Sequence, residues 1–150
     1  MARLEKSGSW LGTLSSLLGR WRSRKSEPKE YRKETGDRGE DVALRYLRWR
    51  GWRLLDRNWR TAGGEIDLVV RRGRVVAFVE VRSRHAGSLV DPEMTVTREK
   101  QHHVRYAAKH YLASRGIDPG LYYRFDIIAV EFPEKGWPRV THFPDAFREG

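Results

Sequence analysis

A strand–turn–strand pattern centred on a glycine constrains this chain more than any other feature. The runs Gly64–Val70 and Ala77–Arg82 alternate apolar and charged residues, as strands with one buried face do. The dipeptide Gly73-Arg74 between them suits a two-residue type II′ turn, which takes glycine at its first central position. Closing that turn pairs Arg72 with Val75 and sets the register of the whole hairpin.

This register places two acids directly opposite each other. Asp67 lies across from Glu80 and Glu65 across from Arg82, while Ile66, Leu68 and Val70 share the other face. Opposed side chains in a sheet have Cβ atoms only about 5 Å apart, so two carboxylates there repel. A shared proton, a neighbouring arginine or lysine, or a divalent cation must offset that repulsion.

Two interpretations of the acid pair are open at this point. Two carboxylates and a backbone carbonyl are the usual protein share of a magnesium site, which water and a substrate phosphate complete. Such an ion polarises phosphate and generates hydroxide near neutral pH. The alternative is a solvent-facing hairpin held by charge pairs, Glu65 with Arg82 and Asp67 with a neighbouring arginine.

The remaining periodicity predicts an α/β fold, a small mixed β-sheet flanked by helices in the order α-β-β-β-α-β. Thr97 and Gly116 have the residue types that cap a helix start and end. A loop is expected over 83–96, and the tail after Phe132 has no readable pattern. The predicted helices are Asp37–Arg50 and Arg98–Arg115, and the predicted strands are Trp52–Trp59, Glu65–Arg71, Val75–Arg82 and Tyr122–Phe132.

Two helical residues sit on stripes that ought to be buried. Glu40 shares a stripe with Ala43 and Leu47, and Lys100 precedes Val104 by one helical turn. Buried carboxylates are uncommon without a partner, so both residues are predicted to converge with the acid pair and Arg82 on one face of the sheet. The alternatives are an acid favoured by the helix dipole, for Glu40, and an exposed first-turn residue, for Lys100.

The charge of the chain indicates a polyanionic partner. Lys plus Arg is 30 against 20 for Asp plus Glu, a net charge of +10, which favours nucleic acid first and an anionic membrane second. The absence of cysteine excludes disulfide scaffolds, thiol catalysis and cysteine-based zinc sites. Without a secretory signal or a transmembrane run, the chain is expected to be cytoplasmic. The residues predicted to contact phosphates are Arg84, Arg98, Arg105 and Lys109.

The basic charge also suggests a boundary in the chain. Residues 1–33 carry nine Lys/Arg and three Glu, a net +6, and are predicted to be a poorly ordered basic extension of a domain over 34–150. Its apolar stripe from Trp10 to Trp21 docks loosely in one interpretation. In the other it is an amphipathic anchor for a membrane or a partner groove.

A set of motifs between residues 34 and 132 resembles the YraN-like family of bacterial proteins, which is similar to the restriction-endonuclease-like PD-(D/E)XK fold and, within it, to archaeal Holliday-junction resolvases. The resemblance implies that Asp67 and Glu80 are the metal-binding acids, that Glu40 is the helix-borne acid of resolvases, and that two copies form a homodimer. The motifs are Gly36 to Glu40, Arg57-Asn58-Trp59-Arg60, Gly64-Glu65-Ile66-Asp67-Leu68, Phe78-Val79-Glu80-Val81-Arg82-Ser83-Arg84, Lys100 and Arg124-Phe125-Asp126.

One departure from the family pattern bears on catalysis. Arg82 occupies the position where the family usually has lysine, and arginine cannot act as a base because it stays protonated. Arg82 is then expected to stabilise the phosphorane, with Lys100 as substitute base or phosphate clamp. The implied function is a Mg²⁺- or Mn²⁺-dependent endonuclease that hydrolyses DNA, including branched or junction DNA. The alternative is a non-catalytic DNA- or RNA-binding module with a degenerate site.

Overall fold

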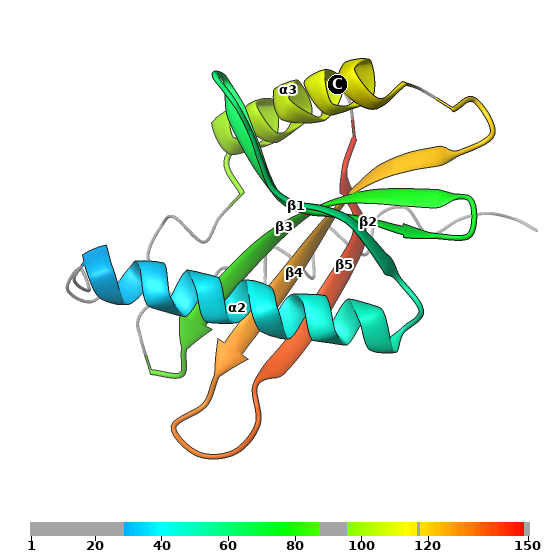
Figure 1. Cartoon of the computed structure of the whole chain (residues 1–150). Coiled ribbons are helices and arrows are strands. Elements are labelled where there is room, and N and C mark those ends of the chain that lie inside the picture. The colour runs from blue at the N-terminus through cyan, green and yellow to red at the C-terminus, as the bar shows by residue number, and fades with distance from the viewer. Residues whose placement is uncertain (1–28, 88–95, 117, 149–150) are drawn as a thin grey trace, which may run out of the picture.

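The computed structural model describes residues 29–87, 96–116 and 118–148, so the predicted stripe from Trp10 to Trp21 lies outside the described residues. Two helices flank one five-stranded sheet (Figure 1), which confirms the predicted mixed α/β fold. Along the chain the elements are α2 (Lys29–Trp49), β1 (Arg53–Thr61), β2 (Gly64–Arg72), β3 (Val75–His85), α3 (Arg98–Arg115), β4 (Tyr122–Phe132) and β5 (Arg139–Phe147).

The sheet has the strand order β1-β2-β3-β4-β5, with β3 and β4 parallel and the other neighbours antiparallel. The parallel pair requires a crossover, which contains α3. The hairpin register is confirmed from Arg72↔Val75 to Leu68↔Val79. Gly73 has a φ of 58°, the positive value that the first central residue of a type II′ turn needs.

The helices cover opposite faces of the sheet. Val76 and Phe78 of β3 belong to a buried cluster with Val104, Ala107 and Tyr111 of α3. The alternate β3 residues, Ala77 and Val79, belong to a second cluster that contains Ala43, Leu44 and Leu47 of α2. The core is therefore two apolar layers with the sheet between them, and a residue's place along β3 decides which helix it meets.

Both ends of α3 and the C-terminal end of α2 lie at capping residues, whereas the start of α2 differs from the prediction. α3 spans Arg98–Arg115 as predicted, with the Thr97 hydroxyl accepting from Lys100 N and Gly116 at φ 82°. Gly51, at φ 83°, follows the end of α2, where its N–H donates to Arg48 O at 3.0 Å. α2 begins at Lys29 rather than Asp37, so the last residues of the predicted extension are helical.

Two strand predictions need correction. β3 continues to His85 into the predicted loop, and the tail contains an additional strand, β5, at the edge of the sheet. Pro144 weakens the strand signal of β5, but an edge strand tolerates proline because it lacks a second neighbour. Buried Asp126 of β4 holds β5 in place, since it accepts from Asp145 N at 2.9 Å and contacts His142 Nε2 at 2.7 Å.

The residue types of Trp49, Trp52 and Trp59 predict that all three pack in the core, and the structure confirms this for two of them. Trp52 is buried and Trp59 packs against the α3-side core, whereas Trp49 is 88% exposed at the end of α2. The prediction is wrong for Trp49, which follows Arg48 on the outer side of the helix.

The tip of the β1–β2 hairpin lies directly against α3 (Figure 1). A Cβ on Gly64 would fall far inside van der Waals contact with the backbone carbonyl of His103, and one on Gly63 would meet the Tyr106 ring. Neither glycine has a positive φ, so close helix packing is the constraint there. It positions Lys100 of α3 over the strands that carry the acids.

We expect Gly64→Ala to lower the free energy of unfolding by about 1–3 kcal/mol, the usual cost of overpacking a contact that cannot relax. Gly36→Ala in α2 is the matched control, because an added Cβ there meets nothing within 4 Å. That variant is expected to be neutral or to gain up to about 1 kcal/mol from helix propensity. Urea denaturation measures both, and equal stability of the two variants would contradict the close approach.

Candidate active site

The β2–β3 ladder ends at the pair Leu68↔Val79. Asp67 and Glu80 are the next residues on each strand, on the side away from the turn. Asp67 is half-buried and Glu80 is buried with 3% exposure. In place of a strand partner, Val81 N–H donates to Asp67 Oδ2 at 2.7 Å. Both predicted acids therefore lie at a fork where β2 separates from β3, and the carboxylate of Asp67 bridges to the neighbouring strand.

The fork results from a change of face in the β1–β2 hairpin. Asn58 of β1 has a φ of 52°, and its neighbours pair as Arg57↔Leu68 and Trp59↔Ile66, which brings Asn58 opposite Asp67. Leu68 and Val70 pack in the α2-side cluster, but Ile66 packs in the α3-side cluster. The prediction that Ile66 shares a face with Leu68 is wrong, because alternation is interrupted at Asp67.

The same change of face corrects the predicted pairing of Glu65 with Arg82. Glu65 lies opposite Arg60 of β1 in the register, 3.5 Å from Arg60 Nε. Its other carboxylate oxygen is 3.8 Å from Lys100 Nζ. Arg82 instead contacts Glu80, so the charge pairs of the solvent-facing interpretation are not present in the predicted form.

Two cations approach Glu80, and both meet the same oxygen. Lys100 Nζ and Arg82 Nη2 each lie 3.4 Å from Glu80 Oε1. The other oxygen, Oε2, is buried and has no hydrogen-bond partner among the described residues. Buried polar atoms are normally satisfied, and in this site Glu80 Oε2 and Arg82 Nε both lack a partner among the described residues; Oε2 is the acceptor that a cation would satisfy.

Glu40 approaches Asp67 from the opposite side of the sheet. α2 carries Glu40, whose Oε2 accepts from both Arg57 Nε and Arg57 Nη2 at 3.2 Å. Asp67 is the charge that acts most strongly to raise the pKa of Glu40, after burial itself. The expectation that all five residues converge on one face is therefore wrong: Glu40 and Lys100 come from opposite faces and meet at the fork through Asp67 and Glu80.

Burial and mutual repulsion favour the protonated forms of the acid pair. Burial, with the Glu80 carboxylate next, raises the pKa of Asp67 to about 7, although the Val81 N–H and Lys100 act in the other direction. Burial also raises the pKa of Glu80, against the opposing effects of Arg82 and Lys100. The pair therefore retains a proton close to neutral pH, where isolated carboxyls are ionised.

This shift predicts how stability depends on pH in a metal-free buffer. The folded state holds a proton on Asp67 up to about pH 7, whereas an unfolded aspartate loses it near 3.8. The stability contributed by this group is present below pH 3.8 and is lost as the pH rises through 7, at no more than about 1.4 kcal/mol per unit. Asp67→Asn should therefore gain stability relative to wild type between pH 5 and pH 8. Urea unfolding in EDTA measures this, and parallel pH profiles for the two proteins would contradict it.

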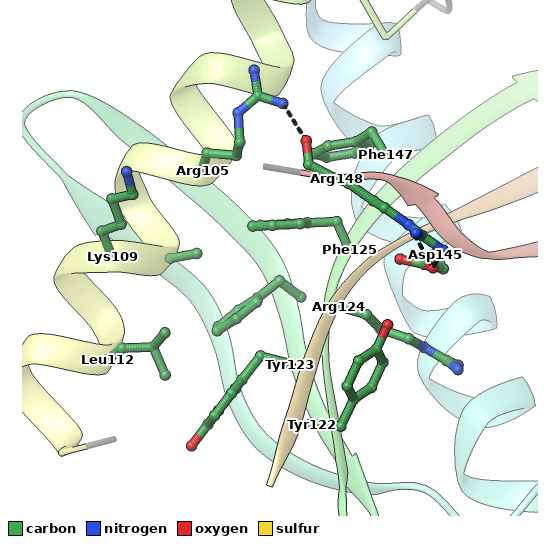
Figure 2. Close-up of a pocket in the computed structure, with 12 residues that line it drawn as sticks. Arg105, Lys109, Leu112, Tyr122, Tyr123, Arg124, Phe125, Asp145, Phe147 and Arg148 are labelled. Carbon is green, nitrogen blue, oxygen red and sulfur yellow. Dashed lines mark hydrogen bonds and ion pairs between the residues drawn. The ribbon is translucent and has the colours of Figure 1, made fainter. Parts of the chain in front are cut away.

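The four predicted phosphate contacts do not form one surface. Arg84, near the end of β3, forms an ion pair with Glu131 of β4, and Arg98 is exposed at the first residue of α3. Arg105 and Lys109 lie further along α3, at the rim of a pocket between this helix and β4 (Figure 2). The predicted set is thus divided between the sheet and the outer side of α3.

The pocket beside Arg105 and Lys109 has a volume of about 280 Å³. Aromatic residues, among them Tyr123 and Phe125, form its wall, and Figure 2 shows them between α3 and β4. The guanidinium of Arg105 donates to the backbone carbonyl of Arg148 at 3.1 Å. Arg105 therefore ties the end of the described chain to α3, in addition to any contact with a ligand.

Sequence reasoning missed the structural roles of Arg57 and Asn58. Both belong to a motif noted in the sequence, but only the fold shows that Arg57 holds Glu40 and that Asn58, at φ 52°, interrupts the alternation of faces within β1. The signal available in advance was the residue type, since asparagine adopts positive φ more readily than most residues.

The donor set of the site suits a hard cation. No three His, Asp or Glu side chains within the described ranges are arranged to hold a metal ion by themselves. The pair Asp67 and Glu80 supplies carboxylate oxygens only, which is the chemistry that Mg²⁺ and Mn²⁺ prefer, with other oxygens from backbone, water or phosphate. The unpartnered Glu80 Oε2 fits such an ion.

The fold and the site define a small α/β protein with a buried acid pair at a forked hairpin and cations from a helix and a strand beside it. The family model described as "Uncharacterised protein family UPF0102" matches residues 39–130, and the chain belongs to this family. The YraN-like resemblance noted in the sequence is thereby confirmed. Neither described helix is long and apolar enough to cross a membrane.

Curated relatives cover most of the described domain. A UPF0102 protein of Anaeromyxobacter dehalogenans is 48% identical over 117 residues, which cover 77% of this chain and 85% of the relative. A UPF0102 protein of Myxococcus xanthus is 41% identical over 127 residues, which cover 85% of this chain and 98% of the relative. A UPF0102 protein of Clostridium perfringens is 35% identical over 121 residues, which cover 80% of this chain and 98% of the relative. Similarity to these proteins establishes the family and names no activity.

Proposed function

We propose that this protein is a Mg²⁺- or Mn²⁺-dependent endonuclease of the restriction-endonuclease-like class that hydrolyses phosphodiester bonds in DNA, with branched or junction DNA as its substrate. The observation that carries the proposal is the buried acid pair, in which Glu80 Oε2 has no partner among the described residues. Two adjacent carboxylates with raised pKa values are unfavourable in a metal-free sheet. Perturbed groups of this kind concentrate at functional sites.

Each residue of the site has a distinct role in this proposal. Asp67 and Glu80 hold the ion, and Glu40 assists directly or through a water molecule. A bound ion supplies polarisation of the phosphate and a water of lowered pKa. Arg82 stays protonated and stabilises the negative charge of the phosphorane. Lys100, already 3.4 Å from Glu80, provides the ammonium that the family motif usually places at position 82.

One observation favours a second candidate, a nucleic-acid-binding module without catalytic activity. Arg82 stands at the usual lysine position and its Nη2 contacts Glu80, so it helps to neutralise the acid. In that case the site retains its charge balance and binds phosphate without cleaving it. Fold and family do not distinguish the two candidates, but activity does.

A cleavage panel tests the proposal. The purified chain is incubated with 10 mM MgCl₂ or MnCl₂ and a four-way junction, a flap, a plain duplex, a single strand or an RNA. Asp67→Asn serves as the inactive control. We expect metal-dependent cuts in the junction or flap that the control lacks. Binding without cleavage of any substrate would favour the second candidate. Size-exclusion chromatography of the same sample tests the expected homodimer.

A further inference from the structure

Six arginines gather at the β2–β3 turn end of the sheet, far from the acid pair. The strand register places Arg53 and Arg71 on the α3 side of the sheet, whereas Arg72 faces its α2 side, so the cluster surrounds this end of the sheet. Arg53 and Arg71 are register partners, Arg72 Nη1 donates to Arg50 O at 3.2 Å, and Arg71 Nε donates to Gly73 O at 2.9 Å beside Arg74. We call this set the turn arginines: Arg48, Arg50, Arg53, Arg71, Arg72 and Arg74.

In the part of the chain that the structure describes, the turn arginines differ from most other arginines because they have no acidic partner. Among the described residues, no carboxylate oxygen lies within 4.0 Å of any of their guanidinium groups. The contacts they do make are with backbone carbonyls and with ring faces, such as Arg50 over Tyr46 at 4.5 Å and Arg72 over Trp52 at 4.8 Å. Arginines elsewhere form ion pairs: Arg57, Arg60, Arg82, Arg84, Arg115, Arg124, Arg139 and Arg148.

A structural role for the cluster accounts for only part of it. Arg48 and Arg50 complement the negative end of the α2 dipole, and Arg72 helps to cap that helix. Arg53, Arg71 and Arg74 belong to strands and their turn, where no dipole favours a cation. Adjacent like charges repel, so a surface that retains them together suits an anionic partner.

The position of the cluster relative to the acids indicates what that partner is. Glu80 and Arg74 are separated by six residues along the β3 edge of the hairpin, which at about 3.3 Å per residue is roughly 20 Å. That span corresponds to about six base pairs of duplex DNA at 3.4 Å each. Arginine also presents the planar fork that binds phosphate through two hydrogen bonds.

We propose that the turn arginines bind the phosphate backbone of one DNA duplex arm about six base pairs from the phosphate held at Asp67 and Glu80. This inference rests on the proposed function for its choice of DNA and extends it by a second contact region. The contacts are with phosphates and not with base edges, so the affinity they add is independent of sequence and sensitive to salt.

The test compares two variants that lose the same charge. Arg48→Gln/Arg53→Gln/Arg74→Gln alters three members of the cluster, of which Arg74 also donates to Gly120 O at 2.8 Å, so circular dichroism and a melting curve check that this variant folds. Arg38→Gln/Lys135→Gln/Arg139→Gln removes three exposed charges at the opposite end of the sheet, where Arg38 contacts Phe132 and Arg139 pairs with Glu131. Binding to a fluorescent 20-base-pair duplex is followed by anisotropy between 50 and 200 mM KCl in EDTA, so that cleavage plays no part.

For the turn variant we expect binding at 50 mM KCl to weaken on the order of tenfold or more. The steepness of its plot of log affinity against log salt should decrease by about 2.7, because each of three lost phosphate contacts contributes about 0.9 to the slope. The control variant should keep the wild-type slope within about one unit. An unchanged turn variant, or equal losses in both variants, would overturn the inference. So would a turn variant that loses binding to phosphatidylserine vesicles while keeping its affinity for DNA.

Failure of this inference is distinguishable from failure of the proposed function. A wild-type protein that binds no DNA in EDTA removes the basis of both. A wild-type protein that binds with a turn-arginine-dependent slope but cuts nothing in the cleavage panel supports the inference and leaves the non-catalytic module as the function.

Discussion

The Asp67→Asn protein is expected to fold normally and to lose metal-dependent DNA cleavage on the order of a thousandfold or more. Removing one of two carboxylates that hold an ion eliminates several kcal/mol of transition-state stabilisation, and each 1.4 kcal/mol is about tenfold in rate. The amide oxygen of asparagine still accepts from Val81 N–H, so the strand contact at the fork survives. Initial rates on the best substrate of the panel, with circular dichroism as the check on folding, measure the effect.

Glu80→Gln should lose cleavage to the same extent but differ in stability. Glu80 is the shared ion-pair partner of Lys100 and Arg82. Removing its negative charge leaves both cations without this ion pair next to a buried side chain, which is destabilising. We therefore expect Glu80→Gln to melt below wild type in EDTA at pH 8, and Asp67→Asn to melt at or above it. Glu65→Gln is the matched control, because this acid is half-exposed and lies outside the pair. If Glu65→Gln reduces cleavage as much as Asp67→Asn, nearby charge and not the buried pair determines activity.

Lys100→Ala is expected to lower the cleavage rate about a hundredfold, whereas Arg82→Lys keeps or raises it. The first change removes the ammonium from beside Glu80, and positioned acid–base or charge-stabilising groups contribute at least that much. The second restores the residue usual in the family and keeps the positive charge. Rates at saturating Mn²⁺ separate this effect from metal affinity.

Lys135→Ala, which removes an exposed lysine between β4 and β5, controls for the loss of one positive charge. Unchanged turnover in Lys100→Ala would contradict the assignment of the missing amine to α3. Activity that appears only in Arg82→Lys, with an inactive wild type, would identify the protein as a nuclease that lost its activity by one substitution.

Local patterns in the sequence predicted much of the fold. Capping residues delimit α3 correctly at both ends, and the glycine turn sets the register of β2 and β3 through Leu68↔Val79. Both depend on interactions between residues close in the chain. β5 was not predictable in this way, because its proline-containing sequence is held by Asp126, sixteen residues from His142.

The candidate site was predictable in its membership and not in its geometry. The proximity of Asp67 and Glu80 follows from the turn register and period-two alternation, but their direct pairing does not form, because the β2–β3 ladder ends at Leu68↔Val79. The change of face at Asn58 turns Ile66 to the α3 side and opens the fork. It depends on the positive φ of Asn58 and on the packing of α3 against Gly64. Because alternation alone does not include this change of face, it predicts that Glu65 lies opposite Arg82. In the structure the ion-pair partners of Glu65 are Arg60 and Lys100.

The most direct test of the acid pair as a metal centre is a melting curve of EDTA-treated protein at pH 8, with and without millimolar MnCl₂ or MgCl₂. Because the pKa of Asp67 is about 7, this carboxyl is largely ionised at pH 8, and an ion meets less competition from a proton there than at lower pH. We predict a saturable rise in the melting temperature of wild type, equivalent to about 2.7 kcal/mol at one hundred times the dissociation constant, and no rise for Asp67→Asn. A wild type that does not respond to either ion, or an Asp67→Asn protein that responds equally, would contradict the account.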